Sequence, residues 1–228
     1  MGKLTAHAIV ERALEIGDTE GLDAVTIRRL ATDLGVTPMA LYWHFKNKEQ
    51  LLVGMADHLI SGFAPEPADD RSWQCQLRDL AEGLIRVLRR YPCAKNVLAQ
   101  VDQAAVPSFL AVWDQALGLA REAGFSMEES CLISKYLLQS AIAIADAPVH
   151  FSSGRTPEEI AELVRVKRLG LESLPADRYP NLVEMAGPMV EGMRPGFYDT
   201  FGVDLVLTGI EALATARRNP ASEVVDTT

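Results

Sequence analysis

The chain lacks several features that would assign it to a common class of protein. Its 228 residues contain no run of about 18 uncharged apolar residues, the length that a membrane-spanning helix needs. The three cysteines, Cys75, Cys93 and Cys131, form no C-x-x-C pair, so we expect reduced thiols that act as small apolar residues of helices, in a cytoplasmic protein. The N-terminal segment is amphipathic and contains acidic residues, which is unlike a signal peptide.

The chain also lacks the short motifs that common enzyme classes need. No G-x-S-x-G, P-loop, H-E-x-x-H or Rossmann glycine pattern occurs, and acidic pairs such as Glu158/Glu159 are typical of solvated helix faces. His58 and His150 could share a metal ion, but without a third ligand we predict no metal site and no cofactor. The sequence therefore favours a binding protein without catalytic residues.

Positive charge is scarce overall but is concentrated in one segment. The formal net charge is −9, which by itself argues against a nucleic-acid partner. Residues 26–48, however, contain four basic residues, Arg28, Arg29, Lys46 and Lys48, and one acidic residue, Asp33. We therefore expect this segment to face DNA phosphates while the acidic remainder of the protein stays away from DNA.

Apolar residues recur at helical spacing along most of the chain, and no alternating strand pattern of useful length occurs. We predict an all-α fold with helices near residues 9–16, 27–34, 37–44, 47–59, 77–91, 109–123, 126–147, 157–171 and 201–216. Residues 148–200 hold six of the twelve prolines, so apart from 157–171 we expect loops there, which could form a lid or portal. We also expect a linker at 63–70 and a disordered tail from residue 219.

The segment from Leu34 to Leu52 is typical of a helix–turn–helix. Gly35 can adopt the left-handed conformation that ends a helix, while Thr37 can cap the next helix with Pro38 at its first position. A helix limited to residues 37–44 is too short to be stable alone, so it must be held by others in order to present side chains. These are the properties of a recognition helix that lies in the major groove of DNA.

Helical geometry divides the side chains of this short helix between two faces. Leu41 and Phe45 are four residues apart and are expected to point inward. Met39 and Ala40, with Thr37, lie near the N-terminal end, where base edges are read. For Trp43 we favour burial in the headpiece core, although its place on the recognition helix keeps it among the candidate DNA-binding residues.

The sequence LYWHFKNKEQLL, together with RSWQCQLRDLA, AGFSMEES and FGVDLVLTGIEAL, resembles the tetracycline-repressor family over nearly the whole chain. The resemblance implies a three-helix DNA-binding headpiece at 1–48 and a larger helical effector-binding and dimerisation domain at 49–218. It also implies a homodimeric repressor that a small-molecule effector releases from double-stranded operator DNA. The alternatives are a small-molecule-sequestering protein without operator binding and an enzyme that uses the same pocket.

Site residues follow from the same resemblance. Arg28 is expected to reach bases, while Tyr42, His44 and Lys48 are expected to bind phosphates. The candidate DNA-binding residues are Thr26, Arg28, Thr37, Pro38, Met39, Ala40, Tyr42, Trp43, His44, Lys46 and Lys48. The candidate pocket residues are Ile60, Phe63, Leu84, Leu88, Val101, Phe109, Trp113, Leu137 and Gln139.

The chain departs from the tetracycline-binding members of the family in both sites. Pro38, Met39 and Ala40 replace a Gln-Pro-Thr sequence, so the operator is expected to differ. No histidine lies between residues 59 and 149 to hold magnesium–tetracycline, and Leu80 and Ala116, with Ala64, replace polar drug contacts. We therefore predict a larger, flatter and more apolar effector, such as an antibiotic or aromatic metabolite. Its polar anchor would be Gln139, Asp146 or Arg194.

Overall fold

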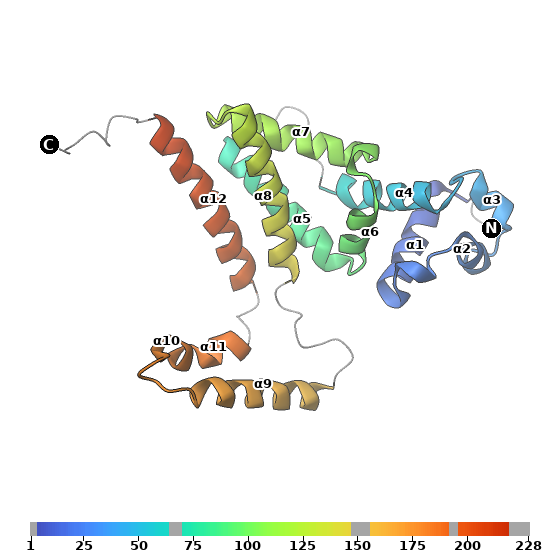
Figure 1. Cartoon of the computed structure of the whole chain (residues 1–228). Coiled ribbons are helices and arrows are strands. Elements are labelled where there is room, and N and C mark those ends of the chain that lie inside the picture. The colour runs from blue at the N-terminus through green and yellow to red at the C-terminus, as the bar shows by residue number, and fades with distance from the viewer. Residues whose placement is uncertain (1–3, 64–69, 147–155, 192–195, 219–228) are drawn as a thin grey trace.

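The computed structural model describes residues 4–63, 70–146, 156–191 and 196–218 (Figure 1). Within these ranges the chain is built of helices and short 3₁₀ turns, without a strand, so the predicted all-α fold is confirmed. In chain order they are α1 (Ala6–Glu20), η1 (Leu22–Ala24), α2 (Ile27–Asp33), α3 (Pro38–Tyr42), α4 (Lys48–Ser61), α5 (Trp73–Arg90), α6 (Ala94–Gln100), η2 (Gln103–Ala105), α7 (Pro107–Glu122), α8 (Met127–Asp146), α9 (Pro157–Glu172), α10 (Pro180–Glu184), α11 (Ala186–Glu191) and α12 (Phe197–Arg218). None of the described helices is both long and apolar enough to cross a membrane.

Helices α1, α2 and α3 form the headpiece, at the opposite side of the molecule from α12 (Figure 1). The side chain of Thr5 caps α1 by accepting a hydrogen bond from the amide of Ala8 (3.2 Å). In the apolar stripe of α1, Ile9, Ala13 and Ile16 are each at most 1% exposed. Because this stripe packs against α4 as well as α2, the headpiece continues directly into the larger domain.

The larger domain is organised around α8, which packs against α5, α7 and α12 (Figure 1). A close approach of α12 to α8 depends on Gly202, where a Cβ atom would lie 2.8 Å from Cγ1 of Ile144. Ion pairs also hold α12 in place: Arg89 of α5 pairs with Asp199 of α12 (2.5 Å), and Arg217 of α12 pairs with Glu129 of α8. The core of the domain is therefore a tightly packed helical layer with charged contacts at its edges.

Helices α9, α10 and α11 pack on one another and lie beside the main body rather than within it (Figure 1). The prediction of a loop-rich segment after residue 171 was wrong, because α10 and α11 are helical there. Pro180 occupies the first turn of α10, a position where its missing N–H costs no helical hydrogen bond. The final helix also begins earlier than predicted, at Phe197 instead of Phe201.

The cysteines differ in their surroundings. Cys75 on α5 and Cys131 on α8 lie on helices, as predicted, but are exposed, whereas Cys93 is buried at the N-cap of α6. The Cys93 amide donates to Oδ1 of Asp18 on α1 (2.8 Å), and burial, with a smaller effect of Asp18, raises the pKa of the Cys93 thiol to about 12. Cys93 therefore fastens the start of α6 to the headpiece and stays protonated. The predicted linker at 63–70 and tail from 219 lie almost entirely outside the described residues.

Candidate DNA-binding surface and ligand cavity

The turn between α2 and α3 has the conformation predicted from its sequence. Gly35 has a φ of +65°, and the amide of Val36 next to it donates to the carbonyl of Ala31 (2.9 Å), which closes the end of α2. The Thr37 hydroxyl accepts a hydrogen bond from the amide of Ala40 (3.4 Å), with Pro38 at the first turn of α3. Helix α3 is shorter than the predicted 37–44, because Trp43 already serves as its C-cap.

The side chains of α3 divide sharply between the core and the solvent. Leu41 is 0% exposed and Phe45, just after the helix, is 8% exposed. Phe45 fits against Gly54 of α4, where a Cβ atom would lie 2.7 Å from the ring, so α4 carries the recognition helix through this contact. Met39 is 65% exposed and Trp43 is 83% exposed.

The prediction that Trp43 lies in the headpiece core was therefore wrong. Trp43 is two residues from both Leu41 and Phe45, so on a helix it points to the opposite side from the two buried anchors. Its ring projects into solvent beside the exposed Tyr42 and His44. We call the exposed side chains of Met39, Tyr42, Trp43 and His44, on α3 and directly after it, the α3 face.

Helix α2 places two of the candidate residues differently. The Thr26 hydroxyl caps α2 by accepting from the amide of Arg29 (3.1 Å), so Thr26 has a structural task. Arg28 is exposed, and within the described ranges its guanidinium forms no ion pair. Arg29, by contrast, donates to both carboxylate oxygens of Glu20 (2.7 and 2.9 Å). Of the two adjacent arginines, Arg28 is the one that can turn to a partner.

An ion-pair network fixes the angle between α1 and α2. Asp33 accepts from Arg12 (2.6 Å) and from Arg29 (3.1 Å). The hydrogen bond from Arg12, followed by that from Arg29, lowers the pKa of the Asp33 carboxyl below its ordinary value. The network links α2, the helix that carries Arg28, to α1 and so orients the headpiece.

The two lysines after α3 are both exposed but have different contacts. Lys48 donates from Nζ to the carbonyl of Leu22 (3.0 Å), so its ammonium group lies against η1. The backbone amide of Lys46 donates to Oε1 of Gln50 (2.9 Å), and Oδ1 of Asn47 accepts from the amide of Gln50 (2.8 Å). These bonds begin α4 much as the expected capping box would, with the glutamine reaching one residue further back.

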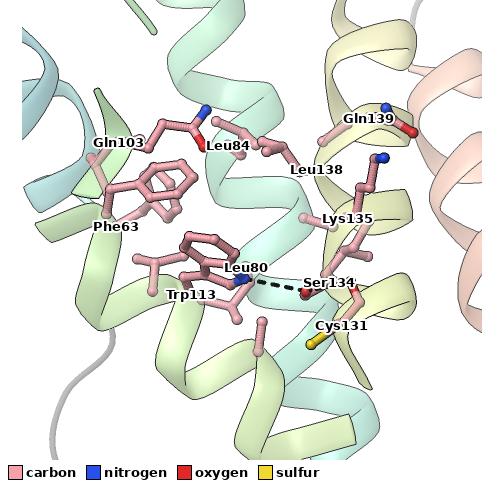
Figure 2. Close-up of a pocket in the computed structure, with 17 residues that line it drawn as sticks. Phe63, Leu80, Leu84, Gln103, Trp113, Cys131, Ser134, Lys135, Leu138 and Gln139 are labelled. Atoms are coloured by element: carbon pink, nitrogen blue, oxygen red, sulfur yellow. Dashed lines mark hydrogen bonds between the residues drawn. The ribbon is translucent and has the colours of Figure 1, made fainter. Parts of the chain in front are cut away.

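The larger domain contains a cavity of about 510 Å³ between α4, α5, α7 and α8 (Figure 2). Its walls are mainly apolar, which is typical of a site for a small organic molecule. It is lined by Ile60, Phe63, Leu80, Ala81, Leu84, Gln103, Phe109, Val112, Trp113, Ala116, Cys131, Ser134, Lys135, Leu137, Leu138, Gln139 and Ala141.

Most of the predicted pocket residues meet at this cavity. Of the nine, Ile60, Phe63, Leu84, Phe109, Trp113, Leu137 and Gln139 line it. Leu88 and Val101 do not, because Leu88 lies one turn beyond Leu84 on α5 and Val101 ends α6; both are half-buried against the core. Leu80 and Ala116, which were expected to replace polar drug contacts, also line the cavity.

The polar side of the cavity was largely missed from the sequence. Cys131, Lys135 and Gln139 follow one another at four-residue intervals along α8, and Ser134 lies beside them. The indole Nε1 of Trp113 donates to the hydroxyl of Ser134 (3.3 Å), which connects α7 to α8 across the cavity (Figure 2). The helical interval counted back from Gln139 was the signal that could have identified Cys131 and Lys135.

The other predicted polar anchors do not lie at the cavity. Asp146 is paired with Lys95 and is not among the lining residues, and Arg194 lies outside the described residues. No group of three or more possible metal ligands occurs among the described residues. The His58 ring lies 5.0 Å from that of His7, and burial lowers the pKa of His58. His150 lies outside the described residues.

An apolar strip remains uncovered on the outer side of α8 and α12. Tyr136 on α8 is exposed, as are Phe201, Leu205 and Leu213 on α12. At Gly209, which lies between the two leucines on the same helical face, a Cβ atom would meet no atom within 4 Å. We call Leu132, Tyr136, Phe201, Leu205, Gly209 and Leu213 the outer strip.

Known proteins share both parts of this arrangement. Residues 9–55 match the bacterial regulatory proteins of the tetR family, and residues 65–214 match the tetracyclin repressor-like C-terminal domain. The chain is 30% identical to the HTH-type transcriptional repressor DrrR1 of Streptomyces coeruleorubidus, over 96% of this chain and 82% of that protein. It is 31% identical to the class C tetracycline repressor protein of Escherichia coli, over 93% of each chain.

Solved structures agree over the same span. Apo ActR of Streptomyces coelicolor superposes with a TM-score of 0.76 at 27% identity, covering 95% of this chain and 99% of ActR. ActR in complex with actinorhodin gives a TM-score of 0.74 at 28% identity, covering 93% and 99%. Because family models match both the segment that holds the helix–turn–helix and the larger domain, this protein belongs to the tetR family of DNA-binding transcriptional regulators.

Proposed function

We propose that the protein is a cytoplasmic, homodimeric repressor that leaves its operator when a flat, largely apolar molecule enters the cavity. It acts by binding alone and carries out no catalytic step. The observation that supports the proposal most strongly is the position of α4, whose Gly54 meets Phe45 just after the recognition helix and whose Ile60 lines the cavity.

The headpiece, which we assign to residues 1–48, would bind DNA through the α3 face and Arg28. Thr37, Met39 and Ala40 would meet base edges, and the apolar side chains at 39 and 40 suit thymine methyl groups. Arg28 would pair with a guanine, while Tyr42 and His44 would contact phosphates. Lys48 would reach a phosphate only after releasing the Leu22 carbonyl, so we assign it a weaker share of the affinity.

The coupling between the two sites runs through α4 and α7. Ile60 of α4 and Phe109 of α7 both line the cavity. The amide of Ser108 at the start of α7 donates to Oδ1 of Asp57 on α4 (2.9 Å), so a shift of α7 is passed to α4. Helix α4 has 14 residues and is about 21 Å long, so a tilt of about 5° displaces its headpiece end by about 2 Å.

A displacement of this size matters because the repressor would be a dimer. The outer strip of α8 and α12 offers a self-complementary apolar surface for a second copy of the chain. Two recognition helices must then fit half-sites about 34–36 Å apart, or a multiple of that distance. A coupling of about 1–3 kcal/mol between ligand and DNA would lower operator affinity by about 5- to 150-fold.

The cavity composition supports an effector other than magnesium–tetracycline. Leu80 and Ala116 present hydrocarbon, and no histidine lines the walls among the described residues. The relative ActR was solved with actinorhodin, and by analogy we propose an antibiotic or aromatic metabolite here. The superposition on ActR covers 93% of this chain, so the analogy extends over nearly the whole protein.

A mobility-shift experiment tests the proposal. The purified protein should shift DNA from beside its own gene in a salt-sensitive way, and a panel of aromatic antibiotics should contain a compound that releases it. Arg28→Ala should weaken operator binding by about 1–3 kcal/mol and relax specificity at one base pair. Arg86→Ala, which removes an exposed positive charge from α5, is the matched control and should bind as the native protein does.

Two outcomes would contradict the proposal. Equal losses in Arg28→Ala and Arg86→Ala would mean that the net charge of the protein, and not the position of Arg28 on the headpiece, determines its contribution to DNA binding. Absence of any shift, with ligand binding intact, would favour a sequestering protein of the same fold.

A further inference from the structure

Among the described residues, the lining of the cavity carries positive charge and no negative charge. Among the described residues that line it, Lys135 alone carries a formal charge; the other polar side chains are Gln103, Cys131, Ser134 and Gln139. Ser134 already accepts a hydrogen bond from Trp113 (3.3 Å). The cavity therefore offers an incoming molecule apolar walls, two amides, a thiol and one ammonium group.

Lys135 has no counter-ion of its own. Within the described part of the chain it forms no ion pair and no side-chain hydrogen bond. The positions three and four residues away on α8, 131, 132, 138 and 139, carry no acidic residue, so the usual helical partner is missing as well.

Carboxylates are numerous in this acidic protein, but among the described residues none pairs with Lys135. The net charge is −9, and some cations of the same helical domain do have carboxylates: Arg78 with Asp204 (2.7 Å), and Lys95 with Asp146. An unpaired ammonium at the edge of an apolar cavity is stable only because the side chain is exposed and remains hydrated. The ammonium group of Lys135 is therefore available to bind an anionic group of a ligand.

The geometry also says where the rest of such a molecule would lie. Figure 2 shows Phe63 and Trp113 on one side of the cavity and Lys135 on α8 on the other. The Phe109 ring meets Trp113 edge-on at 5.9 Å, so the aromatic wall is continuous. A flat ring system can rest on this wall while an acidic substituent at its edge reaches Nζ of Lys135.

We propose that the effector is an organic anion: an aromatic molecule with one carboxylate, phenolate or comparable acidic group that pairs with Lys135. The inference rests on the proposed function, since it specifies the chemistry of the ligand in the same cavity. The positive charge selects the acidic form of a metabolite over its neutral ester or amide. Burying the rest of the molecule supplies the affinity, and the ion pair supplies the selectivity.

Two dyes with the same rings provide the test. Anilinonaphthalene sulfonate is an aromatic anion, and phenylnaphthylamine has the same skeleton without the sulfonate. The dissociation constants of both dyes are measured by fluorescence titration for the native protein, Lys135→Met, Lys135→Arg and Lys167→Met. Lys167 on α9 lies outside the cavity, so its variant controls for the loss of one positive charge.

We expect Lys135→Met to weaken the anionic dye by about three- to tenfold and to leave the neutral dye within about twofold. Lys135→Arg should retain the preference for the anion, and Lys167→Met should change neither dye. Ala116→Phe, which fills the cavity, should weaken both dyes and so place them inside it. Thermal melting of each variant confirms that it is folded.

Equal weakening of both dyes in Lys135→Met, or no change in either, would overturn the anion proposal while leaving the ligand-gated repressor intact. Equal weakening of the anion in Lys167→Met would overturn it too, because only the net charge would then matter. Failure of both dyes to bind the native protein in the cavity would overturn the anion proposal together with the proposed effector site.

Discussion

Replacing Trp43 by alanine should leave the fold intact and weaken DNA binding. Replacing Leu41 by alanine should instead lower the free energy of unfolding. Trp43 is 83% exposed, so it buries 17% of its surface. For a side chain of about 250 Å², that is about 40 Å², or about 1 kcal/mol at the usual transfer energy. Leu41 is 0% exposed, and removing a buried leucine costs about 2–5 kcal/mol.

Thermal unfolding at a fixed protein concentration separates the two variants. For a chain of this size each kcal/mol lowers Tm by about 2–4 °C, so Leu41→Ala should lose about 4–20 °C and Trp43→Ala at most about 4 °C. A mobility shift should then show that Trp43→Ala binds its operator about tenfold more weakly although it is folded. A melting loss in Trp43→Ala as large as that of Leu41→Ala would refute the outward orientation, and unchanged operator affinity would remove Trp43 from the α3 face.

Two further predictions concern the headpiece and the dimer. Because Arg12 and Arg29 lower the pKa of Asp33, the stabilisation by this carboxylate is complete above its ordinary pKa of 3.8 and is lost as the pH falls below about 4. Asp33→Asn should be less stable than the native protein at pH 7 and should show a smaller further loss on acidification; parallel curves from pH 7 to pH 3 would contradict the network. Leu205→Glu, at an exposed position of the outer strip, should keep the helical circular dichroism spectrum and sediment as a monomer, and a dimer that persists would exclude this surface as the seam.

The sequence was most informative where a residue type has a specific role at a helix end, such as glycine in a left-handed turn or threonine and asparagine as N-caps. Gly35 at the end of α2, Thr37 as a cap and Asn47 as the next cap define the turn, α3 and the start of α4, and all three act as predicted. These interactions involve residues within five positions of one another. Local rules are therefore sufficient to place the helix–turn–helix.

The wrong predictions concern residues whose type usually favours one environment while their position in the helix favours another. Tryptophan is usually buried, and this preference was given more weight than the helical angle between Leu41 and Trp43, which predicts exposure. Proline was interpreted as a helix breaker after residue 171, but Pro180 lies in the first turn of α10, where it is tolerated. In both places the geometry of the helix decides, and not the average behaviour of the residue.

The cavity could be predicted from the sequence only in part. Apolar helix stripes identify Ile60, Leu84 and Trp113 as inward-facing, and they do line it. Which of the exposed polar residues on α8 join them depends on how α8 is rotated against α5 and α7, and that is a property of long-range packing. For Lys135 the sequence offers one signal, its four-residue spacing from Gln139, and the placement of the helices shows that both residues line the cavity.

The separation of roles within α3 has a consequence for how this regulator can change over evolutionary time. Leu41 holds the helix, while Met39 and Trp43 project outward with little of their surface buried. Substitutions on the outward side can therefore alter which operator is recognised at a cost of about 1 kcal/mol, which is small beside the stability of about 5–15 kcal/mol that domains typically have. A duplicated copy of such a gene could acquire a new target promoter through a few mutations at these sites, while every intermediate remains a folded protein.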